Sequence, residues 1–109
     1  MPVNFKLGIL FCRDLKGMRN FIIDCAKIET ASEFWNAYVT ITEPEGANYF
    51  GKNLDAFWDA ISAGGPGWPG ECEIKIINTA QLRKINNGAF FEALRCIAND
   101  SEAIRIQIE

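Results

Sequence analysis

Apolar and polar residues alternate along several short stretches of this chain, which is the pattern of strands in a sheet. In residues 3–11 an apolar side chain occupies every second position, and residues 104–108 repeat the pattern more strictly. Residues 73–77 form a third such stretch. Residues 21–23 are apolar on both sides, as in a central strand whose two faces are covered.

Between these stretches, apolar residues recur at the spacing of helices. Thr30 and Glu33 have the spacing of a capping box, and Pro44 closes the helix that they begin. Trp35 and Tyr38 lie on this helix, where we expect them in the core rather than on a binding surface. Three further helices are predicted, at residues 53–63, at 80–84 behind a possible Thr79 cap, and from 88 to about 100.

The order of these elements predicts an α/β fold in a single domain covering residues 1–109. Helical crossovers separate the strands at 21–24, 73–77 and 104–108, so these three should run parallel with right-handed connections. Residues 1–20 add a strand and a turn, and we expect that strand to pair antiparallel with 21–24.

The segment Tyr49–Ile61, YFGKNLDAFWDAI, carries three different surfaces when it is read as a helix. Asn53 is a good N-cap, and Gly64 stops the helix. One face is apolar, and small alanines at 56, 60 and 63 are predicted roughly opposite to it. The apolar face contains Leu54, Phe57, Trp58 and Ile61.

The remaining side of this helix is polar and acidic. It contains Asp55, Asp59 and Ser62, which together we call the acidic face, and Trp58 stands at its border with the apolar face. Acidic residues on a helix are often only solvated. Two carboxylates beside a large aromatic side chain, however, suit a cationic partner.

Charge is distributed unevenly, although the net charge is only −3. Residues 1–20 sum to +3, whereas residues 43–73 contain six acids and one basic residue, Lys52. An acidic surface repels phosphate backbones and attracts cationic proteins. We therefore expect no direct binding of nucleic acid.

The cysteines and the absence of histidine limit which metal sites, disulfides and catalytic groups the chain can form. The four cysteines, at 12, 25, 72 and 96, form no C-x-x-C pair, and the chain contains no histidine. We expect no metal site, no cofactor and four buried or half-buried free thiols, which indicates a reducing cytoplasm. No signal peptide or membrane span is recognisable. Without a histidine base, and with Asp55 and Asp59 on a convex surface, we predict no enzyme activity.

The segment around the predicted acidic helix resembles the signature of the barstar family, whose members inhibit ribonucleases. The match runs through Tyr49-Phe50-Gly51, Asn53-Leu54-Asp55-Ala56-Phe57 and Trp58-Asp59. A weaker similarity extends from about Phe21 to the C-terminus, leaving the first 18 residues or so outside it. The resemblance implies a three-stranded parallel sheet with helices packed on it. It also implies an inhibitory surface on this helix, its preceding aromatic and the following loop.

Carried over position by position, the resemblance implies that the partner-binding residues are Tyr49, Asn53, Leu54, Asp55, Trp58, Asp59, Ser62 and, in the loop AGGPGWPG, Trp68. Two departures stand out. Lys52 occupies a position where the best-known member has an acid. The family's carboxylate on the last helix falls here at Cys96 or Ala98.

The function implied is that of a monomeric immunity protein or antitoxin that blocks a cognate ribonuclease toxin in a heterodimer. An alternative is a barstar-like interaction module that regulates a basic partner unrelated to any toxin. A neighbouring gene for a basic toxin domain would separate the two.

Overall fold

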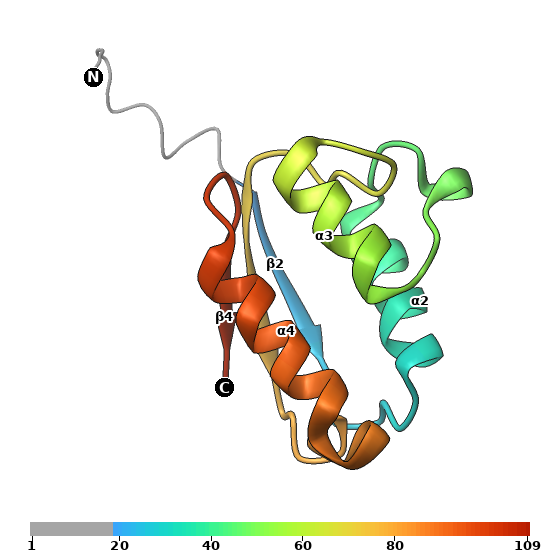
Figure 1. The fold of residues 1–109 in the computed structure, drawn as a ribbon, viewed down its shortest axis with the longest axis vertical. Coiled ribbons are helices and arrows are strands. Elements are labelled where there is room, and N and C mark those ends of the chain that lie inside the picture. Colours follow the sequence, from blue (N-terminus) through green and yellow to red (C-terminus); the bar gives the residue numbers. More distant parts are fainter. Residues whose placement is uncertain (1–18) are drawn as a thin grey trace.

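The computed structural model describes residues 19–109. Its centre is a sheet of three strands, β2 (Arg19–Asp24), β3 (Cys72–Ile77) and β4 (Arg105–Ile108), in the order β2-β3-β4 (Figure 1). Both pairings are parallel, and Ile23, Ile76 and Ile108 lie in register across the sheet. The predicted parallel sheet is therefore confirmed, with β3 in the centre.

Within residues 19–109, β2 forms one edge of this sheet. A central position for β2 depends on pairing with residues 3–11, so it stays a prediction. Ile22, on the side of β2 away from the helices, is 57% exposed. An apolar run of three residues looks the same at the edge of a sheet as in its middle, because the spacing of apolar residues does not show which strands lie beside it. The antiparallel strand predicted for residues 3–11 lies outside the described residues.

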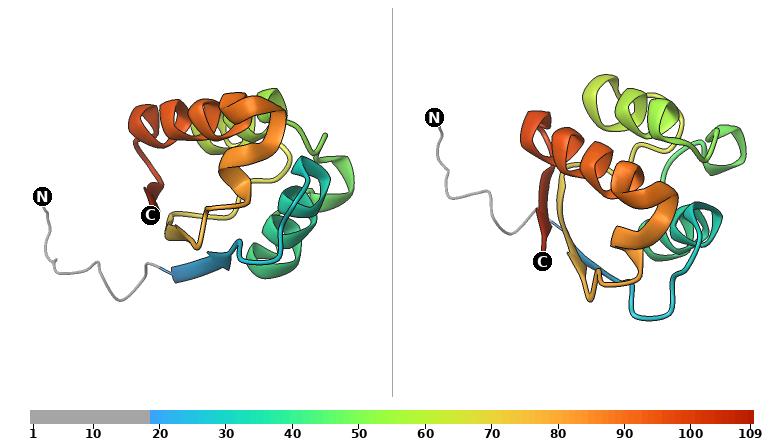
Figure 2. Two further views of the ribbon diagram at one scale, coloured as in Figure 1. Left: turned by 90° about the horizontal axis from the view of Figure 1, so that it is seen from below. Right: turned by 60° about the horizontal axis from the view of Figure 1, so that its bottom comes forward.

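The helices lie on one side of the sheet (Figure 2). Helix α2 (Ala31–Thr42) begins at the predicted capping box, in which the Thr30 hydroxyl accepts from the Glu33 amide at 3.1 Å. Helix α3 (Leu54–Ala63) and helix α4 (Ala89–Asp100) follow, with short 3-10 turns η1 (Ala47–Tyr49) and η2 (Leu82–Gly88) before them. Within residues 19–109 no helix is both long and apolar enough to cross a membrane.

The predicted helix at 80–84 is replaced by η2, which runs from Leu82 to Gly88 and is interrupted by non-helical residues. The predicted cap was wrong because the Thr79 side chain is used elsewhere. Its hydroxyl donates to the backbone carbonyl of Glu109, which ties this turn to the end of β4. This long-range contact leaves no trace in local sequence spacing.

An aromatic cluster fills the space between the helices and the sheet. Trp35 and Tyr38 of α2 are both buried, as predicted. The ring of Phe57 lies 5.3 Å from that of Trp35 and 5.2 Å from that of Tyr38, measured between centroids. Phe34 and Phe90 extend the cluster toward α4, with centroids 5.6 Å apart. These contacts attach α2 to both α3 and α4.

Ala60 corrects the predicted arrangement of α3. It was placed opposite the apolar face, but it is fully buried beside Phe57 and Ile61. Ala60 follows Phe57 by three residues, so both side chains lie on the same side of the helix. The small side chain of Ala60 lets α3 approach its neighbours closely. The buried side of α3 is therefore broader than predicted, and its polar side is turned outward.

Candidate functional site: the acidic face of α3

The start of α3 is fixed by Asn53. Its side-chain oxygen accepts from the Ala56 amide at 2.8 Å, and its side-chain nitrogen donates to the Gly51 carbonyl at 3.2 Å. Both polar atoms are thus used inside the chain. Asn53, predicted as a partner-binding residue, is placed as an N-cap that sets the position of the helix.

The acidic face lies on the exposed side of α3. Asp55 and Asp59 are exposed, and neither side-chain carboxylate accepts a hydrogen bond or forms an ion pair with any residue between Arg19 and Glu109. Ser62, the third member, donates its hydroxyl to the Trp58 carbonyl one turn earlier at 2.5 Å. Two carboxylates without internal partners keep their full capacity to accept bonds from a cationic group outside.

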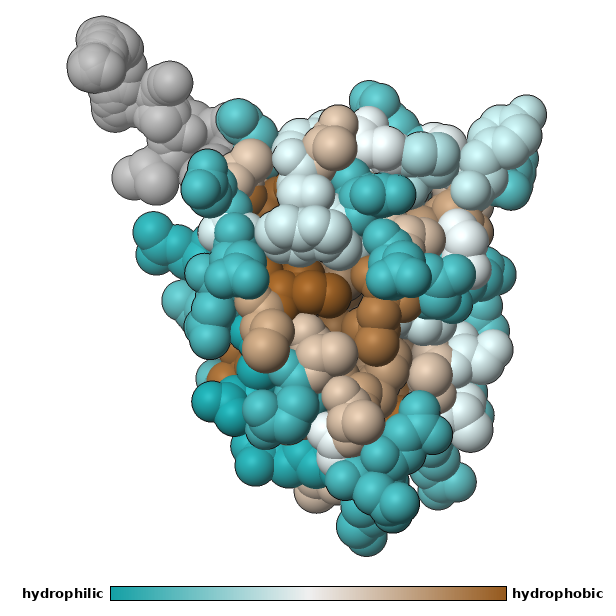
Figure 3. Space-filling model, in the orientation of Figure 1, coloured by the Kyte–Doolittle hydropathy of each residue, from teal (hydrophilic) through white to brown (hydrophobic). Residues whose placement is uncertain are grey.

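Two aromatic side chains accompany the carboxylates. Trp58 is 38% exposed, and Tyr49, in η1, is 82% exposed. Leu54 is half-buried and packs against the core. Figure 3 shows apolar surface between α3 and α4 with polar residues around it. Large exposed aromatic side chains are typical of a protein interface.

Lys52 is held away from the polar side of α3 by its neighbour in α2. Its ammonium donates to the side-chain oxygen of Asn36 at 3.1 Å. It is the one basic residue between 43 and 73, so this bond directs the only cation of the acidic segment toward α2. The negative potential of Asp55 and Asp59 is therefore opposed less than the sequence suggests.

Trp68, predicted as a partner-binding residue in a loop rich in glycine and proline, is held firmly by the rest of the chain. The side chain is half-buried and packs against the core. Its backbone pairs with Glu45, whose amide donates to the Trp68 carbonyl at 2.9 Å. The preceding residue, Gly67, accepts from the Tyr38 hydroxyl at 2.7 Å. The loop after α3 is thus anchored at this point.

Sequence reasoning missed a second acidic segment beside Trp58. A cleft of about 320 Å³ runs between α3 and the turn from α4 to β4, and Asp100 and Glu102 line it together with Trp58 and Ser62. Asp100 is the last residue of α4 and Glu102 follows it, and both are exposed. The search for a last-helix carboxylate considered positions within the helix, at Cys96 or Ala98, whereas the acids lie at its C-terminal end.

The thiols match the prediction only in part. Cys25, Cys72 and Cys96 are free, but Cys96 is exposed rather than buried; Cys12 lies outside the described residues. Burial raises the pKa of both Cys25 and Cys72 to about 11. These two are inert packing residues at neutral pH. Among residues 19–109 no cluster of three or more His, Cys, Asp or Glu side chains could hold a metal ion.

The barstar family model, described as barnase inhibitor, matches residues 18–107. The chain belongs to the barstar family. The match covers every strand and helix described above except the last residue of β4. A search of curated proteins returned no match. Because the family comprises inhibitors, membership fits a protein that binds a ribonuclease rather than one that catalyses a reaction.

Proposed function

We propose that this chain is an immunity protein or antitoxin that blocks the active site of a cognate ribonuclease with the acidic face of α3. The observation that carries the proposal is the pair of exposed carboxylates, Asp55 and Asp59, which have no partner among residues 19–109 and lie on the same helix as the partly exposed Trp58. Membership of a family of barnase inhibitors supports it. The producing cell would hold the complex in its cytoplasm as a heterodimer of one inhibitor and one nuclease.

The chemistry of the partner explains why carboxylates are required. A ribonuclease active site binds the phosphates of RNA through cationic side chains. A carboxylate placed at a phosphate position meets the same cations through charge-assisted hydrogen bonds. Asp59, in the middle of α3 and next to Trp58, is the residue that we assign to this role. Asp55, one turn earlier, then meets a second cation closer to the rim.

The remaining predicted residues have supporting roles. Leu54, Trp58 and Tyr49 supply apolar area that excludes water around the ion pairs. Ser62 completes the polar rim. Asn53 acts through the position of the helix, and Trp68 through the anchored loop beside it.

The cleft between α3 and the α4–β4 turn extends this surface. Asp100 and Glu102 place two more carboxylates next to Trp58, from a segment about 40 positions later in the chain than α3. A guanidinium entering the cleft would lie between these acids and the exposed edge of the indole, where both attract it. The partner therefore meets negative charge from two elements.

The test is the rate of association with a ribonuclease at low and high ionic strength. Barnase and a basic ribonuclease encoded beside this gene are the two probes. Inhibition at one-to-one stoichiometry, with an association rate that falls steeply with salt, is expected because opposite charges steer the encounter. Asp100→Asn should lower the rate at low salt, whereas Glu29→Ala, an exposed acid between β2 and α2, should leave it unchanged. Inhibition of neither nuclease, or a rate indifferent to salt, would contradict the proposal.

A further inference from the structure

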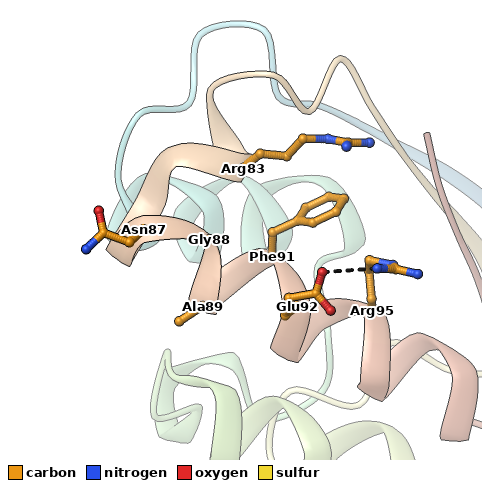
Figure 4. A pocket seen from close by; sticks show the side chains of 7 residues that line it. All are labelled: Arg83, Asn87, Gly88, Ala89, Phe91, Glu92 and Arg95. Atoms are coloured by element: carbon orange, nitrogen blue, oxygen red, sulfur yellow. Dashed lines mark hydrogen bonds and ion pairs between the residues drawn. The ribbon is translucent and has the colours of Figure 1, made fainter.

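A hollow of about 510 Å³ lies at the start of α4, at the other end of this helix from Asp100 and the cleft (Figure 4). Its lining includes Arg83 from η2 and Phe91, Glu92 and Arg95 from α4. Figure 4 shows the two arginine side chains extending to the same side as the Phe91 ring, which lies between them. Two guanidinium groups thus border one open space.

Arg83 is held in place before any ligand arrives. Its guanidinium carbon lies 4.5 Å from the centroid of the Phe91 ring. Its Nε donates to the Thr79 hydroxyl at 3.2 Å, and that hydroxyl is itself bonded to the backbone at Glu109. The terminal nitrogens of Arg83 make no hydrogen bond or ion pair with residues 19–109. An arginine fixed in this way loses little conformational entropy when an oxyanion binds to its free nitrogens.

Arg95 has a partner that a ligand can replace. It forms an ion pair with Glu92 three residues earlier, at 3.0 Å, and both side chains are more than half exposed. Exposed pairs of this kind contribute little to stability, because water screens them. An anion in the hollow can therefore bind Arg95 without disturbing the fold.

The charge around the hollow differs in sign from that of the acidic face. Residues 82–95 contain three basic residues, Arg83, Lys84 and Arg95, against the single acid Glu92, which gives a sum of +2. Residues 43–73, with six acids and one lysine, sum to −5. A basic site within an acidic protein favours an anion.

We propose that Arg83 and Arg95 bind the phosphate group of a small ligand across the Phe91 side chain. A tetrahedral phosphate carries more oxygens and more negative charge than a carboxylate, so it can accept from two guanidinium groups at once and still neutralise both. The ring of Phe91 is buried and already covered by Arg83, so it offers no face on which a nucleobase could stack. Recognition therefore rests on the phosphate alone. This inference is independent of the ribonuclease proposal.

The test is a titration of the protein with inorganic phosphate at constant ionic strength. NMR measures the shifts of the arginine Nε–H signals and of the α4 backbone amides. Shifts confined to Arg83, Arg95 and the first turns of α4 are expected. Arg83→Gln and Arg95→Gln should each weaken binding at least about tenfold, the scale of a lost charge-assisted hydrogen bond. Lys84→Gln removes the same charge from a neighbouring residue outside the hollow and should leave the affinity within about twofold.

Two further arms make the result decisive. Arg83→Lys keeps the positive charge but loses the planar set of guanidinium N–H donors, so it should bind phosphate more weakly than the parent. This variant tests the proposal even if Arg83→Gln fails to fold. Adenosine monophosphate should bind as tightly as inorganic phosphate, and with the same shifts. A response equal to that of chloride, equal losses in Lys84→Gln and Arg83→Gln, or binding of the nucleotide without binding of phosphate would overturn the proposal.

Discussion

Trp35 and Trp58 both lie on helices with apolar residues at helical spacing around them in the sequence. Their surroundings in the folded structure nevertheless differ. Trp35 in α2 is 2% exposed and contacts three other aromatic rings besides its neighbour Phe34. Trp58 in α3 is 38% exposed and lies at the mouth of an acidic cleft. The first is enclosed by the helices and the sheet, whereas the second borders unpartnered carboxylates. The comparison shows that helical spacing selects a helix face, but the layers around that helix decide whether the face is core or interface.

The largest expected effect is on the stability of the buried side. Trp35→Ala and Phe57→Ala should each lower the free energy of unfolding by about 3–5 kcal/mol, because each removes a large buried ring and leaves a cavity among the remaining aromatics. Urea denaturation followed by circular dichroism measures this loss. A loss below about 1 kcal/mol for either variant would show that the aromatic cluster does not stabilise the fold.

Trp58→Ala should separate binding from stability. About a third of this side chain is in contact with solvent, so we expect a stability loss of only about 1 kcal/mol, the usual size for a partly exposed position. Binding to the ribonuclease should weaken by more than about 2 kcal/mol, as for an aromatic residue near the centre of an interface. Calorimetric titration beside a thermal melt gives both values. If Trp58→Ala loses as much stability as Trp35→Ala and still binds the ribonuclease normally, Trp58 is a core residue and not an interface residue.

The cysteines extend the comparison between enclosed and open positions. Burial raises the pKa of Cys25 and Cys72 to about 11 from a usual value of 9.0, so between these values the folded chain keeps protons that the unfolded chain has lost. Stability should therefore fall as pH rises from about 9 toward 11. Replacing both residues by alanine should make this fall shallower, whereas Cys96→Ala should not alter it. In native labelling at pH 8, Cys96 should react and the two buried thiols should not.

Local chemistry explains which features could be predicted from the sequence. The Thr30 capping box, the Asn53 N-cap and the Gly64 stop depend on contacts within four residues, and the structure has all of them. The parallel direction of β2, β3 and β4 followed from the helical crossovers between them.

Features that depend on distant partners were missed. Trp68 is anchored through Glu45, and Thr79 through Glu109, and neither partner can be inferred from spacing. Asp100 and Glu102 come beside Trp58 only because α4 packs against α3. The acidic surface was therefore predicted as one helix, and the structure shows acids from two segments. Whether these side chains bind the partner stays a prediction.

The most direct test of the account is Asp59→Ala, measured for both stability and binding. Asp59 is exposed and lies one turn from Asp55, so its removal relieves a repulsion, and the fold should be equally stable or slightly more stable. Binding to the ribonuclease should fall by more than about 2 kcal/mol, because the partner's active-site cation is left buried without its counter-charge. Lys52→Ala serves as the control and should bind as the parent does or slightly better, since that ammonium is bonded to Asn36. Unchanged binding of Asp59→Ala to a nuclease that the parent inhibits would show that inhibition proceeds through another surface.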